Sequence, residues 1–69
     1  MVINTEKLFR ENLKKFRKAC GYTQTRLAVL ANISQDYMSE IERGKASPSL
    51  KRIIALAKAL NVEVKDLFT

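Results

Sequence analysis

The sequence predicts an all-α domain, a compact bundle of five short helices. Apolar residues recur at helical spacings of three and four along most of the chain, and no segment alternates in the manner of a strand. Residues that commonly cap helices precede each periodic segment. The chain has 69 residues, of which 46% are hydrophobic, so we expect one small domain over residues 1–69.

The first helix is expected over about residues 5–20, with Asn4 or Thr5 as its N-cap. Its apolar stripe consists of Leu8, Phe9, Leu13, Phe16 and Cys20. This spacing places Cys20 in the core. Gly21 follows the last periodic position, where a left-handed glycine commonly ends a helix.

The second and third helices are expected over 24–31 and 35–43, capped by Thr23 and Ser34. The apolar face of the second helix consists of Leu27, Ala28, Leu30 and Ala31. Asn32 tolerates a positive φ, so the two helices can be joined by a very tight turn. In the third helix, Met38 and Ile41 face inward and the opposite face is polar.

The fourth helix is expected over 50–60, capped by Ser49 and ended by Asn61. Its predicted core face consists of Leu50, Ile53, Ile54, Ala57 and Leu60. A last short helix is expected over 64–68. No internal repeat is present in the chain.

The balance of charge points to a polyanionic partner. Thirteen Lys and Arg residues against seven Asp and Glu residues give a formal net charge of +6 at pH 7. Six of the cations fall within residues 7–18 and four within residues 43–52. Nucleic acid is the natural partner for such clusters, and a charge that merely maintains solubility is the alternative.

Several function classes lack the residues they require. The chain has no histidine and one cysteine, which excludes an intramolecular disulfide, a zinc site and His-based acid–base chemistry. We therefore expect no enzyme activity, no metal, no cofactor and no small-molecule ligand. No secretory signal or apolar run of about 18 residues is present, so we expect a cytoplasmic protein without a membrane segment.

The central segment, residues 24–43, has the spacing of a helix-turn-helix, with a small residue at the helix crossing and a special-φ residue in the turn. Further matches in order cover nearly the whole chain. They are 13–17 (LKKFR), 21–24 (GYTQ), 27–28 (LA), 41–44 (IERG), 48–50 (PSL), 56–62 (LAKALNV) and 66–68 (DLF). At these residues the sequence resembles the Cro and phage-repressor family, also called the Xre family, of bacterial helix-turn-helix regulators.

The resemblance implies the lambda-repressor-like fold and sequence-specific binding of duplex DNA as a dimer, with a recognition helix that begins near Ser34. The residues at positions that meet base edges are Ser34, Gln35, Asp36, Ser39 and Glu40. Gln35 is the best candidate because its amide can pair with adenine N6 and N7. Carboxylates repel phosphates, so Asp36 and Glu40 are useful only if they accept from cytosine N4 or orient a neighbour.

The residues predicted to contact phosphates are Gln24, Tyr37, Arg43, Lys45 and Lys51. Gln24 resembles the family glutamine that bonds a backbone phosphate and supports the recognition helix. Tyr37 can reach a phosphate with its hydroxyl. The cations stand at the far end of the recognition helix, where ordinary solvation is the alternative to a DNA contact.

Two further groups follow from the family pattern. Arg17 and Glu42 resemble a structural ion pair that joins the first helix to the third. The dimer candidates are Val62, Val64, Leu67 and Phe68, which can instead close the core of a monomer.

The resemblance predicts a small transcriptional regulator, such as a phage-type repressor or a restriction-modification controller, that binds an inverted-repeat operator as a homodimer. The alternative is a protein-interaction or nonspecific nucleic-acid-binding module, such as an antitoxin-like partner.

Overall fold

The computed structural model describes residues 4–69. Its elements are α1 (Thr5–Ala19), α2 (Gln24–Ala31), α3 (Gln35–Glu42), α4 (Leu50–Leu60) and the 3-10 helix η1 (Val64–Phe68). The all-α class is confirmed for these residues. The fifth element is a correction, since it is a 3-10 helix instead of an α-helix. A five-residue segment is short enough for this tighter winding, which is common in short pieces of chain.

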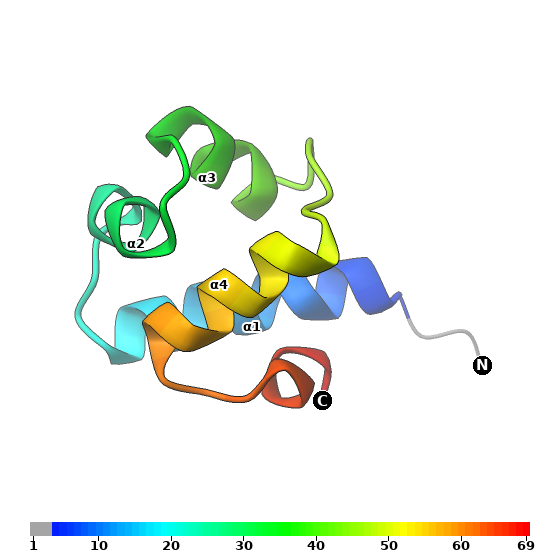
Figure 1. Cartoon of the computed structure of the whole chain (residues 1–69). Coiled ribbons are helices and arrows are strands. Elements are labelled where there is room, and N and C mark those ends of the chain that lie inside the picture. Colours follow the sequence, from blue (N-terminus) through cyan, green and yellow to red (C-terminus); the bar gives the residue numbers. More distant parts are fainter. Residues whose placement is uncertain (1–3) are drawn as a thin grey trace.

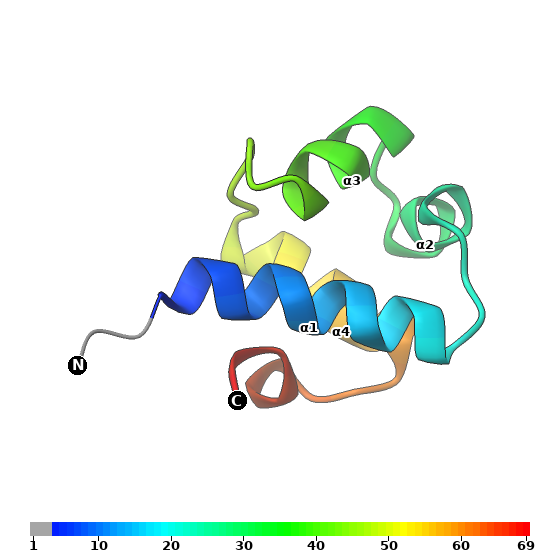
Figure 2. The same cartoon turned by 180° about the vertical axis from the view of Figure 1, so that it is seen from behind.

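Helices α2 and α3 lie together at one side of the molecule, and η1 lies at the opposite side against α1 and α4 (Figure 1). Helix α2 packs on both α3 and α4, and α3 also contacts α1. The view from behind shows α1 running along the body of the molecule, with η1 below it (Figure 2). None of the helices that residues 4–69 form has both the length and the apolarity to cross a membrane.

One core joins all five elements. The buried hydrophobic residues are Phe9, Leu13, Leu27, Ala28, Ala31, Met38, Ile41, Leu56, Ala57, Leu60 and Leu67. Ala28 is 2% exposed at the contact of α2 with its neighbours, in keeping with the small side chain expected there. Met38 and Ile41 are fully buried, as predicted for the inner face of α3.

Four residues predicted for the core or an apolar face are exposed: Cys20, Leu30, Leu50 and Ile54. Cys20 continues the stripe of α1 in phase, but it is the C-cap and extends past the edge of the packed region, where its Sγ lies 3.8 Å from the carbonyl oxygen of Leu60. In α4 the buried stripe includes Leu56, and Leu50 and Ile54 lie on the neighbouring flank of the helix.

The C-terminal segment is fastened to α1 by a buried amide. Asn12 is 6% exposed, and its Nδ2 donates to the carbonyl oxygens of Leu67 and Thr69, each at 3.0 Å. Leu67 has no exposed surface. Its side chain is therefore used within the monomer core, which is the alternative stated for the dimer candidates.

The predicted helix boundaries are set by local hydrogen bonds. Thr23, Ser34 and Ser49 each accept, through the side-chain oxygen, the amide hydrogen of the residue three positions later. Asn32 and Asn61 end α2 and α4 with φ of 58°, in the left-handed region. Both C-caps are confirmed, and asparagine is a residue that adopts this conformation more readily than most.

Candidate nucleic-acid interface

The turn between α2 and α3 is short and internally bonded. The amide of Ile33 donates to the carbonyl oxygen of Ala28 at 2.9 Å, and the amide of Asn32 donates to that of Val29 at 3.2 Å. These bonds satisfy carbonyl groups that the end of α2 leaves open. The chain therefore reverses within three residues, 32–34, and holds α3 at a fixed angle to α2.

The inner face of α3 is locked by a buried carboxylate. Arg17 and Glu42, which were predicted to pair, are in contact. Arg17 Nε donates to Glu42 Oε2 at 2.7 Å, and Nη2 donates to Oε1 at 3.1 Å. Arg17 Nη1 also donates to the carbonyl oxygen of Tyr22 at 2.9 Å, so the guanidinium joins α1, α3 and the segment before α2. The Glu42 side chain is 1% exposed, and this two-bond geometry compensates its burial.

Gln24 adds a third bond to the same carboxylate. Its Nε2 donates to Glu42 Oε1 at 2.9 Å, which links the first residue of α2 to the last residue of α3. The side chain is half-buried. This bond to Glu42 agrees with the predicted role of Gln24 in supporting α3. The predicted contact of Gln24 with a phosphate stays a prediction.

The outer face of α3 is polar and open. Ser34, Gln35, Asp36 and Glu40 are exposed, and Ser39 is half-buried. Ser34 Oγ accepts the amide hydrogen of Tyr37 at 3.0 Å and so caps the helix. The side chains of Gln35, Asp36 and Glu40 make no hydrogen bond to other residues in the range 4–69. Their polar atoms are available to a partner, and the assignment of base contacts to them stays a prediction.

The loop after α3 folds back on the helix that it leaves. The amides of Lys45 and Ala46 both donate to the carbonyl oxygen of Glu40, at 2.8 and 3.3 Å. The predicted phosphate contacts Arg43, Lys45 and Lys51 are all exposed. Arg43 is the C-cap of α3 and Lys45 follows it in the loop, while Lys51 lies in the first turn of α4 and lines a surface depression with Ala31 and Asn32.

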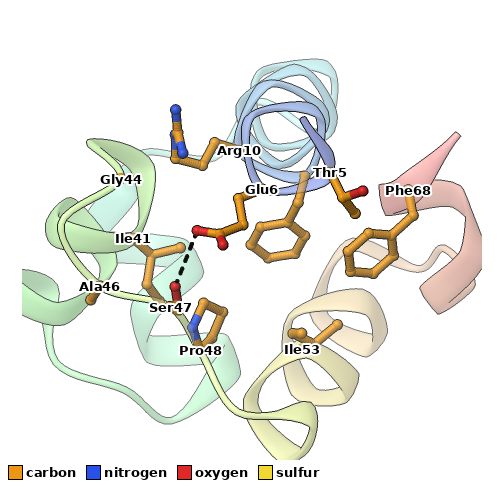
Figure 3. A pocket seen from close by; sticks show the side chains of 11 residues that line it. Thr5, Glu6, Arg10, Ile41, Gly44, Ala46, Ser47, Pro48, Ile53 and Phe68 are labelled. Atoms are coloured by element: carbon orange, nitrogen blue, oxygen red, sulfur yellow. Dashed lines mark hydrogen bonds between the residues drawn. The ribbon is translucent and has the colours of Figure 1, made fainter. Parts of the chain in front are cut away.

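Gly44 lets this loop pass close to α1. Its φ is +78°, and a Cβ built there would lie 2.8 Å from Arg10 Cζ. Figure 3 shows the Arg10 side chain beside Gly44, and Ser47 Oγ bonded to Glu6 Oε2 at 3.5 Å. These contacts border a half-open pocket of about 110 Å³ that Phe68 also lines.

The remaining dimer candidates lie at the opposite side of the molecule from α3. Val62, Val64 and Phe68 are half-buried, and the Phe68 ring stacks on Phe9 with centroids 5.3 Å apart. On α4, Leu50, which the prediction assigned to the core, is 66% exposed.

A family model for the helix-turn-helix matches residues 13–67, which is most of the chain. The chain belongs to the helix-turn-helix family. The turn at Asn32, the capped α3 and the buried inner face described above are the parts of this motif that position a recognition helix.

Curated relatives of this helix-turn-helix chain include regulators. The immunity repressor protein of Bacillus phage phi105 is 41% identical over 57 residues, which cover 83% of this chain and 40% of that protein. The control protein C.SmaI of Serratia marcescens is 30% identical over 67 residues, which cover 97% of this chain and 80% of that protein. The chain thus corresponds to less than half of the phage repressor and to most of the control protein.

Solved helix-turn-helix structures superpose closely. The restriction-modification controller protein C.AhdI from Aeromonas hydrophila matches with a TM-score of 0.87 and 36% identity, over 91% of this chain and 96% of that one. The hypothetical transcription factor NHTF from Neisseria matches with a TM-score of 0.91 and 27% identity, over 96% of this chain and 76% of that one. The predicted membership of the Cro and Xre type is confirmed by these findings together.

The prediction missed one residue near the helix-turn-helix. Arg52 lies on α4, yet its guanidinium carbon is 5.7 Å from the centroid of the Tyr37 ring, and its Nη1 donates to the carbonyl oxygen of Asn32 at 3.5 Å. The sequence signal was its place in the basic cluster 43–52. Its direction could not be predicted, because that depends on how α4 packs beside the turn.

Proposed function

We propose that this chain regulates transcription by binding an inverted-repeat DNA operator sequence-specifically as a homodimer. The observation that carries the proposal is the division of α3. Its inner face is fixed by Met38, Ile41 and the bonded carboxylate of Glu42, while its outer face offers unbonded polar side chains. A rigid helix with such a face suits the major groove, which is about 12 Å wide and presents a different pattern of donors and acceptors for each base pair.

The chemistry of the outer face supports specific readout. We propose that Gln35 pairs with adenine through its amide, as a donor and acceptor together. Asp36 and Glu40 can accept a hydrogen bond from the N4 amino group of cytosine. The hydroxyl groups of Ser34 and Ser39 can donate or accept a hydrogen bond. Gln24, Tyr37, Arg43, Lys45 and Lys51 then hold the flanking phosphates and fix the register without reading sequence.

For the dimer we propose a face that combines Val62, Val64 and Phe68 with the exposed apolar residues of α4. Leu50 and Ile54 are 66% and 41% exposed and stand four positions apart, on one side of the helix. Burial of such side chains stabilises association by about 25 cal/mol per Å². A two-fold dimer of this kind would read half-sites about 10 base pairs apart.

The roles in the names of the relatives suggest two regulatory settings. One is named an immunity repressor and two are named control or controller proteins, the latter of restriction-modification systems in the case of C.AhdI. We propose a role of this repressor or controller kind. A cytoplasmic location, expected from the composition, is part of the proposal.

The experiment that tests the proposal is selection of duplexes from a random DNA pool by the purified chain, at roughly physiological salt, where nonspecific binding is weak, ~10⁻⁴–10⁻⁶ M. We expect an enriched inverted repeat that the Gln35→Ala variant fails to enrich. Wild-type selection without any motif would contradict sequence-specific binding. A protein-interaction or nonspecific nucleic-acid-binding module would then be the better description.

The dimer face has its own measurement, sedimentation velocity over a range of concentrations. We expect Leu50→Lys to shift the chain toward monomer, because it places a charge in an apolar contact. Val29→Lys is the matched control, since Val29 on α2 is 64% exposed against 66% for Leu50. Equal sedimentation of both variants and wild type would rule out this face.

A further inference from the structure

The recognition helix lacks positive charge of its own. Residues 32–42, which include the turn and all of α3, contain three carboxylates and no Lys or Arg. Glu42 is neutralised by Arg17, but Asp36 and Glu40 are exposed on the face proposed to enter the groove. Their repulsion of phosphates must be offset by cations from other elements. Arg43 and Lys45 lie at the C-terminal end of α3, so a further cation is needed near its N-terminal end.

Arg52 from α4 reaches the N-terminal end, and its neighbour Lys51 lines an adjoining depression with Asn32. Its guanidinium lies over the Tyr37 ring at 5.7 Å from the centroid and bonds the carbonyl oxygen of Asn32 in the turn. Arg52 lines one surface depression together with Asn32, Ile33, Ser34 and Tyr37. The side chain therefore bridges from α4 to the first turn of α3.

The guanidinium of Arg52 is free to bind an anion. The ion pairs found in residues 4–69 join Arg17 to Glu42 and Lys65 to Glu63, and neither involves Arg52. A guanidinium carries five N–H donors in a plane, of which this one uses a single donor on Asn32. The contact with the Tyr37 ring uses no N–H donor, so the donors that are not bonded to Asn32 can fork onto phosphate oxygens.

We propose that Arg52 is a phosphate contact, held in place by the Tyr37 ring and the Asn32 carbonyl, that attaches the DNA backbone beside the N-terminus of α3. The inference rests on the proposed DNA-binding function. It gives the acidic recognition helix a cation at each end, with Arg43 at one and Arg52 at the other. It also gives Tyr37 a second role, since its ring orients Arg52 in addition to any contact by its hydroxyl.

The test is fluorescence anisotropy with two duplexes, the selected operator and a scrambled duplex of equal length, over a series of salt concentrations. Because a phosphate contact carries no sequence information, Arg52→Gln should weaken binding to both duplexes by a similar factor, about tenfold. The slope of log K against log salt should become shallower by about 0.9. Lys58→Gln is the matched control, with the same loss of charge on the same helix but beside Tyr22 and Leu30. Lys58→Gln should leave both the affinity for DNA and the salt slope close to those of wild type.

The positioning part has a separate readout, a double-mutant cycle between Tyr37→Leu and Arg52→Gln. If the ring holds the guanidinium, the further loss of affinity from Tyr37→Phe to Tyr37→Leu, which removes the ring but no hydroxyl, is clear in the presence of Arg52 and small once Arg52 is replaced. Tyr37→Phe keeps the ring and should retain the salt slope of wild type. Additive effects in the cycle would overturn the positioning role.

The outcomes separate the two proposals. If wild type binds DNA and Arg52→Gln behaves like Lys58→Gln, the inference about Arg52 is wrong and the proposed function stands. If wild type binds DNA but enriches no motif, the proposal of sequence-specific binding is wrong. The role of Arg52 is then still tested by the affinity of Arg52→Gln for the scrambled duplex. Absence of any binding by wild type would overturn both. Should Arg52→Gln lower the melting temperature, Arg52→Lys keeps the charge and is expected to keep the wild-type salt slope.

Discussion

The two faces of α3, a helix of eight residues, differ in burial and in hydrogen bonding. The inner face has Met38 and Ile41 fully buried and Glu42 held by Arg17 and Gln24. The outer face has exposed polar side chains, of which Gln35, Asp36 and Glu40 make no hydrogen bond to other residues in the range 4–69. The stabilising contacts thus lie on one side of the helix, and the side chains proposed to read DNA lie on the other. Substitutions on the two sides should therefore move different measurements.

The largest effect is expected from Arg17→Ala. It leaves the Glu42 carboxylate buried without its partner, which should cost about 3–5 kcal/mol of unfolding free energy. A domain of this size has about 3–10 kcal/mol in total, so much of the variant should be unfolded at room temperature. Urea denaturation followed by circular dichroism measures the loss, with the neighbouring exposed cation replaced in Lys18→Ala as control. Wild-type melting combined with weaker DNA binding would show that Arg17 belongs to the interface instead.

An intermediate effect is expected from Gln24→Ala, since this residue lies between the two faces. Loss of its bond to the charged Glu42 should cost about 1.5–3 kcal/mol of stability. If Gln24 also bonds a phosphate, affinity for scrambled DNA should fall at temperatures where the variant is fully folded. Denaturation and anisotropy on the same sample separate these contributions. A change in neither would remove Gln24 from both roles.

Gln35→Ala should leave stability within about 0.5 kcal/mol of wild type, because the side chain is exposed and unbonded. Affinity for the selected operator should fall about tenfold and affinity for scrambled DNA should not change. The two affinities come from anisotropy and the stability from thermal melting. A drop in melting temperature of several degrees would break the division between the faces.

The smallest effect is expected from Glu40→Gln. Removal of one exposed carboxylate should strengthen binding to scrambled DNA about twofold and make no measurable change in melting. If Glu40 accepts from a cytosine, the operator enriched by the variant should differ at that base pair. An unchanged operator would indicate that Glu40 is solvated in the complex.

Local signals in the sequence predicted much of this molecule. The caps at Thr23, Ser34 and Ser49 and the left-handed turn at Asn32 follow from the chemistry of a few adjacent residues. The spacing of Met38 and Ile41 correctly indicated the inner face of α3. The contact of Arg17 with Glu42 spans 25 positions and was accessible only through resemblance to a family.

The wrong predictions of burial concern residues whose exposure depends on how the helices pack together, which the spacing of apolar residues within one helix does not specify. Ile54 is close in phase to the buried stripe of α4, and only the placement of the other helices leaves it 41% exposed. Cys20 continues a correct stripe beyond the edge of the core. Asn12 and Arg52 act through partners 55 and 20 positions away, so no local pattern could have indicated their bonds.

The absence of Lys and Arg from residues 32–42 has a consequence for how operator preference can change. In the proposed mode of binding, general attraction to DNA comes from side chains on other elements, while the outer face of α3 determines which bases are preferred. The exposed positions 35, 36 and 40 of that face make no side-chain hydrogen bond within residues 4–69, so they can be exchanged without altering the core or the cap at Ser34. Such a domain suits engineered changes of specificity in which 35, 36 and 40 are randomised together while Ser34 is kept as the cap.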